Sequence, residues 1–100
     1  EEMGVRSRSS ASGAQFALAV STSVITLTVP SAAMTSEIYV RGNSVVFTRD
    51  GTAPTATKGI QANVGDVIVL ASRDELDNFK VIRESDDATL DVEYFTDVSG

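Results

Sequence analysis

The sequence contains no cysteine, no histidine and no tryptophan. Without cysteine the chain can form neither a disulfide framework nor a thiolate metal site. The absence of disulfides is compatible with a cytosolic location. Without histidine it has no Ser-His-Asp triad, no imidazole ligand for a metal and no histidine general base. We therefore expect a protein that is not an enzyme and that binds no metal or cofactor.

The routes to catalysis that remain are weakly represented. Lys58 and Lys80 are the only lysines, and neither follows a serine at the spacing of a Ser-Lys dyad. Asp86 and Asp87 are adjacent, so on a strand they would point to opposite faces and could not share a proton. We interpret the two lysines as surface cations and the two aspartates as a polar turn.

Long hydrophobic runs are also missing. No stretch approaches the roughly 18 apolar residues of a membrane span, and the N-terminus has no cationic segment followed by an apolar one. The net charge is −6, and from Arg73 onward nine acids stand against three bases. Nucleic-acid binding depends on neutralising phosphates with Lys and Arg. We therefore expect neither a nucleic-acid partner nor a membrane partner.

The composition that is present favours strands. Valine, isoleucine and threonine together supply 28 of the 100 residues, and these β-branched side chains crowd a helix and suit a pleated sheet. One hundred residues suffice for one domain. Apolar runs separated by turn residues predict strands at residues 15–20, 24–29, 37–41, 44–49, 58–62, 67–70, 79–83 and 88–95. The expected fold is all-β, a single antiparallel β-sandwich or jelly roll of about eight short strands.

The N-terminal residues 1–14 are rich in serine, glycine and charge, without a sustained apolar period. They predict a flexible N-terminal arm that precedes a β-sandwich domain over residues 15–100. Two interpretations stay open: a disordered tail, or an arm that becomes ordered along a neighbouring subunit. In the strand that follows, alternation places Phe16, Leu18 and Val20 on one side.

Two further segments have specific local signals. In residues 37–41, Ile38 and Val40 should point inward, and Gly42 with Asn43 should form a two-residue hairpin loop that returns the chain antiparallel as residues 44–49. The run at residues 67–70 is uniformly apolar, which predicts a strand buried on both faces.

One short helix is expected after residues 67–70. Ser72 and Glu75 have the spacing of a capping box, so we predict one helical turn around residues 74–78. Asp74, Glu75 and Asp77 are oxygen ligands of the kind that Ca²⁺ takes, but the alternating ligands, central glycine and distal glutamate of a calcium loop are missing. Acids at a helix start explain Asp74 and Glu75 more simply.

Four segments, in order, resemble small β-sandwich virion proteins of tailed bacteriophages. They are DGTAPTATKG at residues 50–59, VGDVIVL at 64–70, FKVIRE at 79–84 and DATLDVEYF at 87–95. Each is common alone, and their order and spacing carry the resemblance, which covers roughly residues 37–95. The first 36 residues depart from this pattern.

The resemblance implies a phage structural protein, a capsid cement or decoration protein that bridges neighbouring subunits of the major capsid protein. It would lie on the capsid surface of the virion after assembly in the host cytoplasm, as a homo-oligomer, either a trimer or a dimer. The expected partner contacts are, in the arm, Val5, Arg6 and Arg8, and in the loop after residue 49, Thr52, Pro54, Thr55 and Lys58.

Two alternatives remain open at this stage. The chain is also compatible with a head-tail connector or a tail or fibre component of the same virion. An alternative from another class is a carbohydrate-binding or adhesin-like module, which would need exposed aromatic side chains. Tyr39 and Phe95 are the candidates for that role, although an outward Tyr39 more often packs across strands.

Overall fold

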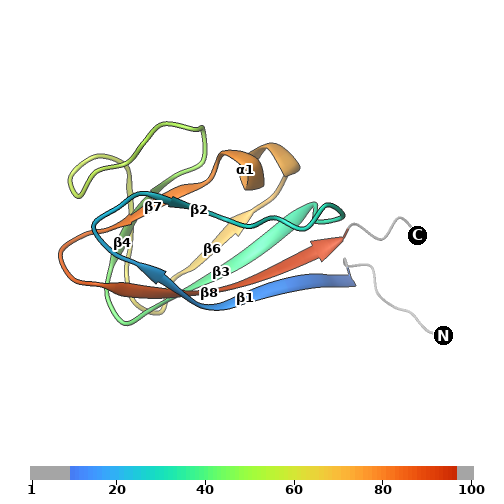
Figure 1. Ribbon diagram of the computed structural model, residues 1–100, viewed down its shortest axis with the longest axis horizontal. Coiled ribbons are helices and arrows are strands. Elements are labelled where there is room, and N and C mark those ends of the chain that lie inside the picture. Colours follow the sequence, from blue (N-terminus) through green and yellow to red (C-terminus); the bar gives the residue numbers. More distant parts are fainter. Residues whose placement is uncertain (1–9, 97–100) are drawn as a thin grey trace.

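A computed structural model of the chain describes residues 10–96. It contains eight strands and one short helix (Figure 1). The strands are β1 (Ser10–Val20), β2 (Ile25–Thr26), β3 (Thr35–Arg41), β4 (Val45–Thr48), β5 (Ile60–Ala62), β6 (Val67–Leu70), β7 (Lys80–Arg83) and β8 (Ala88–Thr96). The helix α1 (Arg73–Asn78) lies between β6 and β7 in the chain.

The strands form two four-stranded antiparallel sheets. Sheet A has the order β1-β8-β3-β6 and sheet B the order β2-β7-β4-β5. The first strand thus pairs with the last, the second with the seventh, the third with the sixth and the fourth with the fifth. This nested order is that of a jelly roll. The structure confirms the predicted all-β sandwich.

The core lies between the two sheets and is built mainly from aliphatic side chains. Alternation along β8 buries Leu90, Val92 and Tyr94, as the sequence predicts. From sheet B, Phe47 on β4 packs against Phe79, with ring centroids 5.6 Å apart. Phe79 is fully buried at the end of α1. The aromatic pair therefore fills the space where α1 leads into β7.

The turn after β3 was predicted wrongly as a hairpin. Gly42 does adopt a positive φ of 83°, but β3 pairs with β8 and β6 whereas β4 pairs with β7 and β5. Residues 42–44 thus carry the chain from sheet A to sheet B. Turn chemistry predicts a reversal of direction, and it does not specify which strand becomes the neighbour.

The first strand begins earlier than predicted, at Ser10, and it is irregular. Its register against β8 shifts twice, and in the second shift Phe16 and Ala17 together oppose Asp91. This β-bulge holds Ala17 at φ 58° and leaves Phe16 71% exposed. Phe16 therefore does not share the inward face of Val20. Residues 10–14 of the predicted arm belong to β1, and residues 1–9 lie outside the described residues.

The strand β6 corrects a second prediction. It is an edge strand of sheet A and pairs with β3, with Glu37 opposite Val69 and Tyr39 opposite Val67. Ile68 and Leu70 are buried, but Val67 and Val69 are exposed. The run at residues 67–70 is thus buried on one face only.

The strand predicted at residues 24–29 is shorter in the structure, because β2 pairs with β7 over two residues. Leu27 and Val29 nevertheless continue the inward alternation and pack against the core.

The predicted N-cap of α1 is confirmed at Ser72, whereas the Glu75 carboxylate bonds to the amide of Ala71, one residue before the amide that a capping box uses. The Ser72 hydroxyl accepts a hydrogen bond from the Glu75 amide at 3.3 Å, and Glu75 Oε1 accepts one from the Ala71 amide at 2.7 Å. Arg73 then fixes the helix to the loop before β3. Its Nη1 donates to the carbonyl oxygens of Pro30 and Ala33 at 2.8 and 2.9 Å, and its Nε pairs with Asp77 at 3.2 Å.

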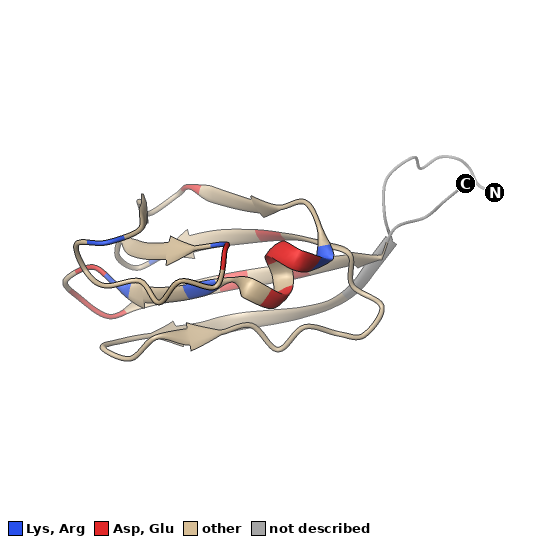
Figure 2. Cartoon of the chain, turned by 90° about the horizontal axis from the view of Figure 1, so that it is seen from above, with Lys and Arg blue, Asp and Glu red and all other residues tan. Residues whose placement is uncertain are grey.

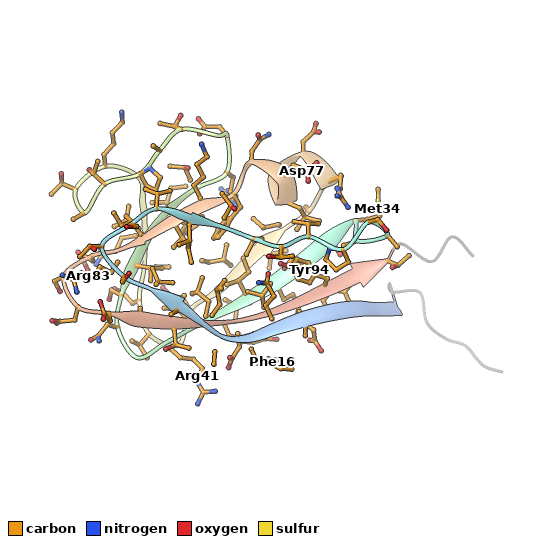
Figure 3. All side chains as sticks on the ribbon, in the orientation of Figure 1. Phe16, Met34, Arg41, Asp77, Arg83 and Tyr94 are labelled. Carbon is orange, nitrogen blue, oxygen red and sulfur yellow. The ribbon has the colours of Figure 1, made fainter. Side chains whose placement is uncertain are left out.

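A polar link at the boundary of the core joins β1, β8 and the segment after β2. The Tyr94 hydroxyl donates to Gln15 Oε1, which also accepts from the Thr28 amide at 3.0 Å. Burial disfavours the phenolate and raises the pKa of Tyr94 to about 12. The Tyr94 ring projects inward between the two layers in Figure 3.

The burial of Tyr94 predicts a loss of stability in alkali. A tyrosine in the unfolded chain releases its proton near pH 10, whereas folded Tyr94 holds its proton to about pH 12. The folded state is therefore favoured below pH 10, and the free energy of unfolding falls as the pH rises from 10 to 12, by at most about 2 to 3 kcal/mol. Urea unfolding of the wild type and of Tyr94→Phe across this range measures the effect. An equally steep fall in Tyr94→Phe would contradict it.

Candidate interaction surfaces

The loop between β4 and β5 is held by its own hydrogen bonds. Asp50 Oδ1 accepts from the Thr52 amide at 3.0 Å, and hydrogen bonds from Thr52 hold the pKa of Asp50 below its ordinary value. Thr55 and Lys58 exchange backbone hydrogen bonds of 3.0 and 3.1 Å. The Thr48 hydroxyl donates to the Thr52 carbonyl. The loop thus presents a preformed shape, which lowers the entropic cost of binding a partner.

Of the four predicted contacts in this loop, three are exposed and one is buried. Thr52, Thr55 and Lys58 are exposed, so they are accessible to a partner. Pro54 is fully buried, and its side chain packs inward beside Gly59. It therefore supports the loop from below and is not available as a surface contact. The predicted arm contacts Val5, Arg6 and Arg8 lie outside the described residues.

An open depression of about 430 Å³ lies between this loop and α1. Thr48, Arg49, Asp50, Ile60 and Glu75 line it. Its two carboxylates already accept hydrogen bonds from backbone amides, Asp50 from Thr52 and Glu75 from Ala71. Both carboxylates therefore hold local structure.

The acidic residues elsewhere also make local contacts. Asp87 Oδ1 accepts from Arg83 Nη1 at 2.6 Å, and Asp77 pairs with Arg73. The helix α1, largely red in Figure 2, carries the acids Asp74, Glu75 and Asp77. Across residues 10–96, no group of three acidic side chains is arranged to hold a metal ion.

The outer face of sheet A combines one ion pair with two exposed aromatic rings. Arg41 Nη1 lies 2.8 Å from Asp91 Oδ2, and Asp91 Oδ1 accepts from the Ala17 amide at 2.9 Å. These contacts, first that of Arg41, hold the pKa of Asp91 below its ordinary value. Tyr39 is 41% exposed and lies opposite Asp91 on the neighbouring strand. Phe16 and Arg41 both project from this face in Figure 3.

Of the predicted aromatic candidates, only Tyr39 lies on the surface. Phe95 is buried, because β8 ends with two consecutive buried residues, Tyr94 and Phe95. Sequence reasoning missed Phe16, because a strict alternation assigned it to the core. The bulge that turns it outward has no clear mark in the sequence, since Ala17 occupies the left-handed position usually taken by glycine.

A second exposed apolar surface follows the edges of β5 and β6. Ile60 is 47% exposed, Val64 55%, Val67 46% and Val69 53%. We call these four residues the apolar edge. Ile60, Val67 and Val69 also line a groove of about 260 Å³ between the two strands. Sequence reasoning missed this surface, because a continuous apolar run does not reveal that one face of its sheet is left uncovered.

Compared with protein-family models, curated proteins and solved structures, the chain gives no significant match. Within the described part of the chain, no helix is long and apolar enough to cross a membrane.

Proposed function

We propose that the protein is a structural component of a tailed-phage virion, a cement or decoration protein that bridges neighbouring subunits of the major capsid protein. The observation that carries the proposal is a jelly roll that displays an apolar edge and a preformed loop. Such a molecule acts through the surfaces that it brings together.

The motif resemblance supports the choice of a phage partner. The four segments that resemble virion proteins fall on the loop before β5, on β6, on β7 and on β8. They therefore span both sheets of the fold, and the loop at residues 50–59 is among them. Under the proposal, Thr52, Thr55 and Lys58 on this loop contact the capsid, and residues 1–9 make a second contact.

A shell loaded from inside by packaged DNA opens at the seams between capsomers. A rigid domain that bridges a seam adds interface area that must be lost before the seam opens. The acidic residues of α1 and of the turn before β8 would repel the genome, which suits a position on the outer surface of the virion. The proposal thus includes no nucleic-acid partner, no catalysis and no cofactor.

The test is reconstitution on shells prepared without the protein. Purified full-length chain should bind such shells and raise the temperature at which they release DNA. A chain lacking residues 1–9 should fold, because β1 begins at Ser10, but should bind weakly. Equal stability of shells with and without the protein would overturn the cement role, and unchanged binding of the shortened chain would overturn the arm contact.

A second candidate, carbohydrate binding, is favoured by one observation. Phe16 and Tyr39 lie on the strands either side of β8 and flank the Arg41–Asp91 pair on the outer face of sheet A. Exposed rings with adjacent charged groups can stack on and hydrogen-bond to sugars. Binding to a glycan array that is lost in Tyr39→Ala would favour this candidate over the structural role.

A further inference from the structure

We propose that β6 pairs with β6 of a second copy across a two-fold axis, so that two A sheets form one continuous eight-stranded sheet. The inference rests on the homo-oligomer part of the proposed function and names its surface and symmetry. It starts from the four sheet edges, because an unprotected edge strand is a template for pairing with another chain.

Three of the four edges are protected. β1 is broken by two register shifts, β2 pairs over two residues and β5 over three. Bulges and very short strands are the usual means by which proteins block edge pairing. β6 has four regular residues, Val67, Ile68, Val69 and Leu70, with no charge, proline or glycine among them. It is the one edge in residues 10–96 that lacks such a device.

The backbone groups of β6 are oriented for pairing. The Val40 amide donates to the Asp66 carbonyl at 3.1 Å, so Asp66 directs its carbonyl toward β3. Backbone direction alternates along a strand, and therefore Ile68 and Leu70 also face β3. Val67 and Val69 direct their amide and carbonyl groups away from the sheet, toward the position where a further strand would lie.

A second copy fits this edge because the strand is self-complementary. With the two-fold axis at Ile68, each Val67 lies opposite Val69 of the other copy, and these are the residues whose backbone groups point outward. The same register places the exposed valines of both copies side by side on the outer face. A two-fold axis sets a residue near its own counterpart, and β6 carries no charge that would repel itself.

The available area indicates a weak dimer. Beyond Val67 and Val69, the pairing would cover Ile60 and Val64, each about half exposed. These residues supply less than the roughly 800 Å² per partner of a standard specific interface. We therefore expect a dissociation constant above the micromolar-to-picomolar range of interfaces of about 1,600 Å².

The test is analytical ultracentrifugation of the full chain at concentrations up to about 1 mM, which populates a dimer whose dissociation constant is about 1 mM or lower. The mass should rise from monomer to dimer. Val69→Lys should weaken association at least about a hundredfold, because it brings like charges together. Val24→Lys is the matched control, since Val24 is also exposed but lies beside β2 on another edge, and it should dimerise normally.

A second variant tests the backbone directly. Val69→Pro removes an outward-facing amide, which an edge strand tolerates, and should abolish the dimer while circular dichroism shows an intact fold. A monomer at all concentrations, a trimer, or a dimer insensitive to both Val69 variants would overturn the inference. Because purified protein is used without shells, such a failure is separate from failure to bind and stabilise the capsid.

Discussion

Replacing Phe79 with alanine is expected to lower the free energy of unfolding by about 3 to 5 kcal/mol. Phe79 is fully exposed in an unfolded chain but fully buried here, against Phe47 at the junction of α1 and β7. The substitution removes this apolar surface and leaves a cavity between the sheets. Since small domains are stable by only about 5 to 15 kcal/mol, the variant should unfold at a much lower urea concentration than the wild type.

The matched control is Phe16→Ala. Phe16 is 71% exposed, so its truncation should change the free energy of unfolding by less than about 0.5 kcal/mol. If Phe79→Ala does not fold, Phe79→Leu should still fold with a loss of about 1.5 kcal/mol or less. Equal effects of the Phe16 and Phe79 truncations would show that the core is placed wrongly.

Replacing Gly59 with alanine is expected to lower the free energy of unfolding by about 2 to 4 kcal/mol. Two effects contribute, a strained backbone conformation and a steric clash. Gly59 has φ +134°, which side chains other than glycine rarely adopt. An added Cβ would also lie 2.6 Å from Val46 Cγ1 and 3.0 Å from the Phe47 carbonyl oxygen. Both atoms belong to β4, so the chain cannot relieve the clash without moving a buried strand.

Gly65→Ala separates the backbone strain from the steric clash. Gly65 also has a positive φ, +94°, but its added Cβ meets no atom within 4 Å. Gly65→Ala should therefore lower the free energy of unfolding only through the strained backbone conformation, by about 1 kcal/mol. Comparable losses at Gly59 and Gly65, measured by urea unfolding, would contradict the close approach of β5 to β4.

The sequence predicts strands well where one face is buried and the other is exposed to solvent. Leu90, Val92 and Tyr94 of β8 and Ile38 and Val40 of β3 follow strict alternation, and all are buried. Pairing is less predictable, since β1 lies beside β8, which is far away in the chain. The hairpin expected at Gly42 failed for this reason: local turn chemistry does not report which distant strand competes for the same edge.

The interaction surfaces were harder to predict than the strands. Thr52, Thr55 and Lys58 were found on the surface because loops carry polar residues outward. Pro54 looked equally suitable, but Gly59 opposite allows the chain to close over it. The apolar edge was not predicted, because the apolar run at residues 67–70 does not show that Val67 and Val69 lie on the face of sheet A turned away from the core.

The central proposal is that this jelly roll serves as a repeated structural unit of a virion. Quantitative mass spectrometry of purified virions, with copies counted against the major capsid protein, tests it most directly. A cement protein should be present in hundreds of copies, because it follows the symmetry of the shell, whereas a connector or tail component would be present in about six to a few dozen. Absence of the chain from purified particles would contradict the proposal.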